Sequence, residues 1–158
     1  VGSEMCIRDS KNAGKTTLMS HTIALLKKQQ LTVATLKHHG HETEDITLQD
    51  DQVDHMKHFQ AGADQSIVQG QAYQQTVTRT RKQTLTEIID KSVTIDFDVL
   101  LIEGFKHADY AKVIVYQNEA ELAQLKQCTH VVYAINLEDE DALAQYDAWM
   151  MQQVKGMK

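Results

Sequence analysis

The chain of 158 residues contains no proline, only two cysteines and no long apolar run. The spacing of Cys6 and Cys128 fits neither a disulfide framework nor a thiolate metal site. No apolar run is long enough for a bilayer-spanning helix, and the first ten residues lack the pattern of a secretory signal. A net charge of -6 and a pI near 5.7 argue against general nucleic-acid or membrane-surface binding. These absences favour a soluble, cytoplasmic protein with no nucleic-acid or membrane partner.

What the sequence does contain is an alternation of apolar strands and amphipathic helices. The expected strands are residues 31–37, 65–69, 97–106, 112–116 and 130–135, and the expected helices are residues 14–29, 53–59, 85–89, 119–125 and 143–154. The strand at residues 97–106 is the clearest, because its near-continuous apolar run is typical of a parallel strand buried on both faces. The pattern predicts an α/β fold, a three-layer sandwich around a mainly parallel sheet, as a single domain over residues 1–158.

Residues 14–17, Gly-Lys-Thr-Thr, match the end of the phosphate-binding loop G-x-x-x-x-G-K-[ST]. In such a loop Lys15 reaches the β- and γ-phosphates, Thr16 ligates Mg²⁺, and the positive end of the following helix attracts the anion. Taken alone, this short motif is better explained as an ordinary helix start. A second element favours the nucleotide reading, because the strand "DVLLIEG" ends in Glu103, a candidate Mg²⁺ ligand, directly or through water. The alternative for Glu103 is a solvated charge at a strand end.

The beginning of the chain does not fit this pattern. A phosphate-binding loop follows a buried strand, but Glu4, Arg8 and Asp9 interrupt any apolar face in "VGSEMCIRD", which is therefore not expected to form one. Asp9 also stands where the loop's first glycine belongs. A carboxylate about 4 Å from a phosphate costs about 4 kcal/mol at an effective dielectric of about 20, roughly a thousandfold in affinity. We therefore expect residues 1 to about 10 to be a non-native replacement of the first strand and glycine, and a restored glycine strand to restore tight nucleotide binding.

Four segments together resemble the bacterial family of molybdopterin-guanine dinucleotide biosynthesis protein B, MobB. They are Lys-Asn-Ala-Gly-Lys-Thr-Thr at residues 11–17, Lys-His-His-Gly-His at residues 37–41, Asp54 followed by Ala-Gly-Ala at residues 61–63, and Ile-Glu-Gly-Phe-Lys at residues 102–106. The similarity extends over roughly residues 11–155.

The resemblance implies a phosphate-loop NTPase fold of the dimeric GTPase/ATPase class. It also implies GTP and Mg²⁺ binding, weak GTP hydrolysis, and partnership with MobA, the guanylyltransferase that attaches GMP to molybdopterin. Molybdopterin itself is a further candidate ligand. Carried over by position, Asn12, Ala13, Gly14, Lys15, Thr16 and Thr17 are nucleotide-binding residues, Lys15 and Glu103 are catalytic residues, Thr16 and Glu103 are the Mg²⁺ ligands, and Asp54 is a family position. The preference for GTP over ATP rests on this resemblance alone.

Five of the eight histidines fall within 21 residues, at positions 38, 39, 41, 55 and 58. A metal site would combine His38 or His39 with His41 and with a histidine of the next helix. A second interpretation uses position, because a loop leaving the carboxyl end of a parallel strand lines the ligand crevice. Lys37 and His38 would then contact the nucleotide's terminal phosphate or an anionic substrate, with Lys106 as an additional cation. The third interpretation is a solvated polar loop.

Two further functions stay open beside a GTP-binding accessory protein. A small-molecule kinase would use the same loop and a mobile lid, for which Arg79 and Arg81 are the available arginines. A non-catalytic interaction domain with a defective loop is the function that Asp9 would favour.

Overall fold

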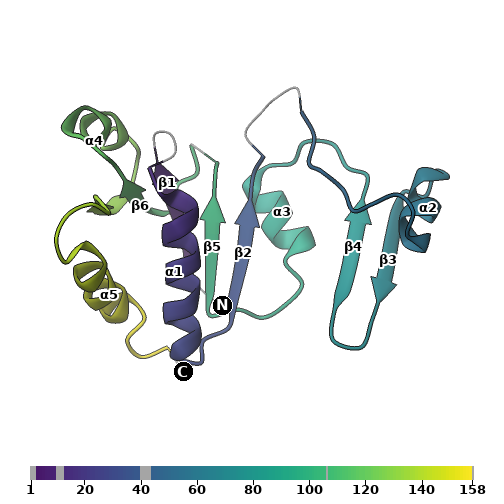
Figure 1. Ribbon diagram of the computed structural model, residues 1–158, viewed down its shortest axis with the longest axis horizontal. Helices are drawn as coiled ribbons and strands as arrows, with labels where there is room; N and C mark the ends of the chain where they lie inside the picture. Colours follow the sequence, from purple (N-terminus) through teal and green to yellow (C-terminus); the bar gives the residue numbers. More distant parts are fainter. Residues whose placement is uncertain (1–2, 10–12, 40–43, 106, 158) are drawn as a thin grey trace. The chain divides into compact units, whose positions relative to one another are not determined.

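The computed structural model describes residues 3–9, 13–39, 44–105 and 107–157 (Figure 1). Contacts along the chain divide it into two compact units, Val1–Gly40 with Lys91–Lys158, and His41–Asp90. Each unit is described by itself below.

The first unit is built on a parallel sheet of five strands in the order β2-β5-β1-β6-β7 (Figure 1). The strands are β1 (Ser3–Asp9), β2 (Val33–Lys37), β5 (Val99–Glu103), β6 (Ala111–Val115) and β7 (Val131–Ile135), and the helices are α1 (Lys15–Lys28), α4 (Glu119–Leu125) and α5 (Ala142–Gln153). The predicted α/β fold with a mainly parallel sheet is confirmed. The predicted strands and helices of this unit all form, with ends shifted by a few residues.

The packing of the core explains why the sequences of these strands are largely apolar. On one face of the sheet Ile7 and Leu101 pack with Leu18 of α1 and Tyr146 of α5, and all four are fully buried. Alternate residues of a strand point to the opposite face of the sheet. Four side chains at these alternate positions are also fully buried, namely Cys6, Leu100, Ile102 and Ile114. Both faces of the central strands are therefore removed from water, as expected for a parallel sheet.

The prediction that residues 1–9 form no strand is wrong. Ser3–Asp9 is the central strand β1, paired in parallel with β5 on one side and β6 on the other. Two residues in its middle, Cys6 and Ile7, supply the buried apolar surface. The acids that seemed to interrupt the strand lie near its ends, and Asp9 is the residue at which the chain leaves the sheet. Pairing on both sides thus outweighs a weak hydrophobic pattern.

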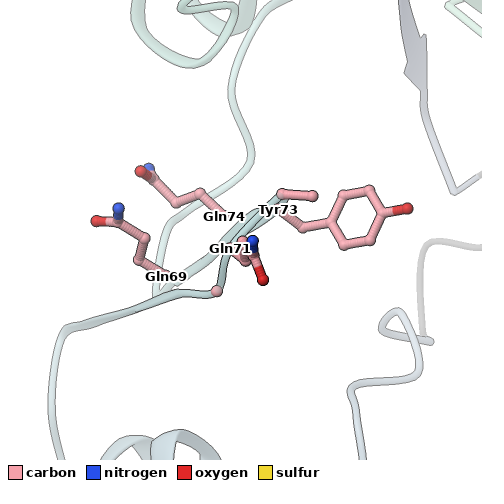
Figure 2. A pocket seen from close by; sticks show the side chains of 6 residues that line it. Gln69, Gln71, Tyr73 and Gln74 are labelled. Carbon is pink, nitrogen blue, oxygen red and sulfur yellow. The ribbon is translucent and has the colours of Figure 1, made fainter.

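The second unit holds α2 (Asp54–Gln60), the antiparallel hairpin of β3 (Gln65–Gln69) and β4 (Gln74–Thr78), and most of α3 (Leu85–Ser92). The prediction missed β4, whose sequence "QQTVT" is polar and largely exposed. A hollow of about 230 Å³ lies at the hairpin turn. Its side chains spread away from one another, and Tyr73 is 86% exposed (Figure 2). The hollow therefore lacks the converging polar groups of a binding site.

Within the residues that the structure describes, no helix is both long and apolar enough to span a membrane.

Candidate nucleotide-binding site

The site lies where the central strand passes to the first helix. β1 ends at Asp9 and α1 begins at Lys15, so the predicted phosphate-binding loop connects them. Gly14 caps the helix with φ 108°, and its carbonyl accepts the N–H of Leu18 at 2.9 Å. A Cβ at Gly14 would lie 2.4 Å from Cδ1 of Leu137, in the segment after β7. This left-handed, crowded position requires glycine.

Lys15 points from the first turn of α1 toward the sheet. Its Nζ lies 3.6 Å from Oε1 of Glu103, at the end of β5, and 3.4 Å from Oδ1 of Asp9, at the end of β1. The side chains of Asp9 and Glu103 are only 7% and 10% exposed, whereas that of Lys15 is 27% exposed. The structure therefore brings together the lysine and the strand-end acid that the sequence singled out.

Asp9 has a role that the sequence did not predict. Its Oδ2 accepts a hydrogen bond from the backbone N–H of Ala13 at 3.2 Å, while its Oδ1 pairs with Lys15. A loop amide and a lysine ammonium are the two kinds of donor that a phosphate-binding loop offers to phosphate. The carboxylate of Asp9 thus occupies part of the loop's anion-binding capacity. Because Asp9 directly precedes the loop in sequence, its proximity to the loop could be predicted. Its pairing with Lys15 could not.

The oxygen atoms here suit Mg²⁺. Mg²⁺ prefers oxygen ligands and keeps water and substrate phosphates in its coordination shell, so one or two protein ligands suffice. The carboxylate of Glu103 lies beside the lysine, and Thr16 and Thr17 are exposed on the first turn of α1. Thr16 and Glu103 thus carry the oxygen atoms that Mg²⁺ prefers, and their role as its ligands stays a prediction. Asn12, the other predicted loop residue, lies outside the described residues.

Lys37 and His38 lie at the same edge of the sheet as Glu103. Lys37 is the register partner of Glu103 across the β2–β5 pair and is exposed. The backbone N–H of His38 donates to the carbonyl of Glu103 at 2.9 Å. Figure 1 shows β2 and β5 ending at the edge where α1 begins. The structure therefore places both predicted residues next to the strand-end acid.

The histidine-rich segment is divided between the two units. His38 and His39 follow β2, whereas His55 and His58 lie on α2, where His55 Nε2 is 2.8 Å from Oε1 of Gln49. His41 lies outside the described residues. The part of the chain that the structure describes holds no group of three or more His, Cys, Asp or Glu side chains arranged around a common metal position. The metal interpretation, which combines His41 with histidines of both units, stays a prediction.

A family model described as "MobB: Molybdopterin guanine dinucleotide synthesis protein B" matches residues 5–138. The chain belongs to the MobB family. It is 35% identical over 116 residues to the "Probable molybdopterin-guanine dinucleotide biosynthesis adapter protein" of Bacillus subtilis (strain 168), covering 73% of this chain and 66% of that protein. It is 30% identical over 110 residues to the "Molybdopterin-guanine dinucleotide biosynthesis adapter protein" of Escherichia coli (strain K12), covering 68% of this chain and 61% of that one. The matches thus span slightly less than two thirds of these MobB relatives.

Solved MobB structures share the fold. The crystal structure of Bacillus subtilis MobB superposes with a TM-score of 0.74 at 27% identity, covering 99% of each chain. A MobB homolog from Bacillus stearothermophilus gives a TM-score of 0.73 at 24% identity, covering 96% of this chain and 97% of that one. The parallel sheet and its helices are therefore the MobB arrangement.

Proposed function

We propose that this MobB family member is a GTP-binding adapter protein with weak GTPase activity in molybdopterin-guanine dinucleotide biosynthesis. It assists a MobA-type guanylyltransferase, as a homodimer in the cytoplasm. The adapter role and the product are those that the names of its relatives carry. The proposed preference for GTP over ATP also rests on these names, because GTP is the nucleotide that supplies the guanine of a guanine dinucleotide.

The observation that carries the proposal is the distance of 3.6 Å between Lys15 Nζ and Glu103 Oε1. A triphosphate at the N-terminus of α1 meets the lysine charge at its terminal phosphates, and its Mg²⁺ meets Glu103 and Thr16. Turnover is slow, because fast hydrolysis uses a glutamine that orients water or an arginine finger. The two motifs, Gly-Lys-Thr-Thr at residues 14–17 and Ile-Glu-Gly-Phe-Lys at residues 102–106, contain neither glutamine nor arginine.

Calorimetric titration with GTP and with ATP, each with Mg²⁺, tests the proposal. We expect GTP to bind more tightly than ATP, and Lys15→Ala to abolish binding. Lys126→Ala, which removes an exposed lysine beyond α4, is the matched control and leaves binding unchanged. Equal affinity for both nucleotides would contradict the preference for guanine. Unchanged GTP binding in Lys15→Ala would show that the loop does not bind the nucleotide.

The pairing of Asp9 with Lys15 favours a second candidate, an interaction domain whose loop binds no nucleotide. A complete lack of GTP binding, together with binding to the guanylyltransferase, would establish it. The kinase alternative loses one of its two candidate lid arginines. Arg79 donates hydrogen bonds to the carbonyls of Phe59 and Ala63 and stacks on the Phe59 ring at 4.1 Å, so it is committed within the second unit.

A further inference from the structure

β7 forms an open edge of the parallel sheet. It is the last strand in the order β2-β5-β1-β6-β7 and pairs with β6 alone, so no strand among the described residues covers its outer side. Such an edge presents backbone N–H and C=O groups that can pair with another strand, and proteins usually protect it with charged residues, proline or a bulge. β7 has a bulge at Val132, but residues 133–135 beyond it carry neither charge nor proline.

Apolar side chains are accessible on β7 and on α5, the helix that packs against it. The rings of Tyr133 in β7 and Trp149 in α5 lie 4.6 Å apart between centroids, and both side chains are half-buried. Val132 is 39% exposed, and Leu143 in the first turn of α5 is 37% exposed. Because side chains alternate between the faces of a sheet, every second residue of an added strand would lie on the face of Tyr133 and Trp149. An added strand would therefore bury apolar surface at this edge.

The formal charge of the chain is concentrated around the same edge. Residues 117–153, which include α4, β7 and α5, contain seven of the 22 acidic residues but only one of the 16 lysines and arginines. The remaining 15 acidic and 15 basic residues balance, so these 37 residues carry the entire net charge of -6. Figure 1 shows α4 and α5 on the side of the sheet away from β2. The open edge thus belongs to the acidic part of the first unit.

Four of the seven acids directly follow the carboxyl end of β7, as Glu-Asp-Glu-Asp at residues 138–141. We call these four residues the acidic run. All four are exposed, and none forms an ion pair with another residue that the structure describes. Lysines or arginines near the end of an added strand would therefore meet carboxylates that are open to pairing.

The charge distinguishes between the occupants that an open edge could take. Two copies of this chain joined at β7 would bring together two surfaces of net charge -6, and like charges across an interface oppose association. A nucleic acid would bring its phosphates to the same carboxylates. A basic segment of another protein brings the opposite charge, and it can supply both the backbone donors and the apolar side chains.

We propose that β7 binds an extended, basic segment of a partner protein as a sixth strand of the sheet. Lysines or arginines of that segment pair with the acidic run, and its alternate apolar residues cover Tyr133 and Trp149. In this mode of recognition main-chain hydrogen bonds give affinity and alternate side chains give specificity. The proposal goes beyond the proposed function, because docking at this edge requires no nucleotide.

The probe is an acetylated and amidated peptide of alternating lysine and valine, about eight residues long and so longer than β7. Calorimetry measures its affinity for the whole chain. Trp149, the only tryptophan, locates the binding through a change in its fluorescence. A peptide with glutamate in place of lysine should not bind. A fully N-methylated peptide keeps the lysines and valines but has no N–H to donate, and should bind at least tenfold more weakly.

Two pairs of variants test the surface. Glu138→Gln with Glu140→Gln should raise the Kd of the lysine–valine peptide at least tenfold. Asp90→Asn with Asp96→Asn, which neutralises two exposed acids outside residues 117–153, should change it less than twofold. Val132→Lys places a charge on the edge strand and should abolish binding. Ile67→Lys makes the same kind of change at an exposed position of β3 and should leave the Kd within twofold.

Several results would overturn the proposal. Equal affinity of the N-methylated peptide would show attraction by charge without strand pairing, and equal Kd values in the two double variants would place the peptide elsewhere. No binding of the lysine–valine peptide would leave the edge without this kind of partner. A dimer that dissociates in Val132→Lys, measured by sedimentation without peptide, would place a second copy there. Separate titrations of the unchanged chain with GTP and with peptide distinguish a failure of the proposed function from a failure of the edge.

Discussion

The ammonium of Lys15 lies between two carboxylates, 3.4 Å from Asp9 and 3.6 Å from Glu103. Both acids are almost completely buried, so water screens these pairs less than it screens surface pairs. The charge of Lys15 is thus balanced by carboxylates of the same chain. A phosphate that binds there competes with these carboxylates for the donors of Lys15.

Asp9→Gly should strengthen GTP binding. The change removes a negative charge from the phosphate site and frees both Lys15 and the Ala13 N–H to bind the ligand. We expect at least a tenfold decrease in Kd by calorimetry, with about a thousandfold as the upper bound given by two charges about 4 Å apart. Asp9→Asn, which removes only the charge, should give an intermediate gain.

Asp96→Asn is the control for that experiment, because Asp96 is an exposed acid before β5, at the opposite edge of the sheet. It should leave the Kd unchanged. Unaltered affinity in Asp9→Gly would show that Asp9 does not compete with phosphate.

Gly14→Ala should both destabilise the protein and weaken nucleotide binding. The left-handed φ of 108° costs an alanine about 1–2 kcal/mol, and the new Cβ displaces Leu137. Denaturant unfolding would measure the first effect and GTP calorimetry the second. Gly62→Ala also has positive φ but meets no atom within 4 Å. It should show the stability loss without the binding loss, and equal GTP affinities in the two variants would contradict this account of the loop.

Lys112→Met should lower the free energy of unfolding by about 2–4 kcal/mol. Lys112 is fully buried, and its Nζ donates to the carbonyls of Ala108, Tyr110 and Thr129. Methionine fills the space but leaves those carbonyls without a donor. Lys126→Met, at an exposed position, should change the stability by less than about 0.5 kcal/mol. Urea unfolding of both variants tests this, and equal effects would refute a bonding role for Lys112.

Tyr146 should make stability depend on pH above 10. Burial raises the pKa of Tyr146 to about 12, and its hydroxyl lies 2.7 Å from Oγ1 of Thr22. Since the folded-state pKa exceeds the unfolded value of about 10, this contribution is complete below pH 10 and is lost as pH rises toward 12.

Tyr146→Phe should remove that part of the pH dependence, roughly 2–3 kcal/mol over the interval. Urea unfolding at about pH 9 and about pH 11.5 measures it as the difference between the unchanged chain and the variant. Tyr73→Phe, at a side chain that is 86% exposed, should keep the pH dependence of the unchanged chain. If Tyr146→Phe also keeps this pH dependence, a group other than Tyr146 causes it.

Most of the fold of the first unit could be predicted, because parallel strands buried on both faces leave a strong sequence signal. "VLLIE" at Val99–Glu103 is buried at every position and was the clearest prediction. The sequence does not predict β1 and β4, because their hydrophobic patterns are weak. In β1 only Cys6 and Ile7 provide fully buried apolar surface, and β4 is mostly exposed, so backbone pairing rather than hydrophobic pattern holds both in place.

The residues of the candidate site could be named from their motifs, but their contacts could not. Gly14, Lys15 and Glu103 carry recognisable spacing, and strand order alone brings the ends of β1 and β5 together. The pairing of Asp9 with Lys15 depends on side-chain direction across the loop. The contact of Phe105 with His38 depends on two left-handed residues in succession. Neither feature has a local sequence signal beyond the glycine before Phe105.

Calorimetric titration of GTP with and without Mg²⁺, on the unchanged chain and on Glu103→Gln, tests the central claim most directly. If Lys15 holds the terminal phosphates and Glu103 holds their metal ion, Mg²⁺ should strengthen GTP binding in the unchanged chain. Glu103→Gln should then lose most of that gain while its Mg²⁺-free affinity is equal or higher, since an acid beside Lys15 has been removed. An identical Mg²⁺ effect in both proteins would contradict the account.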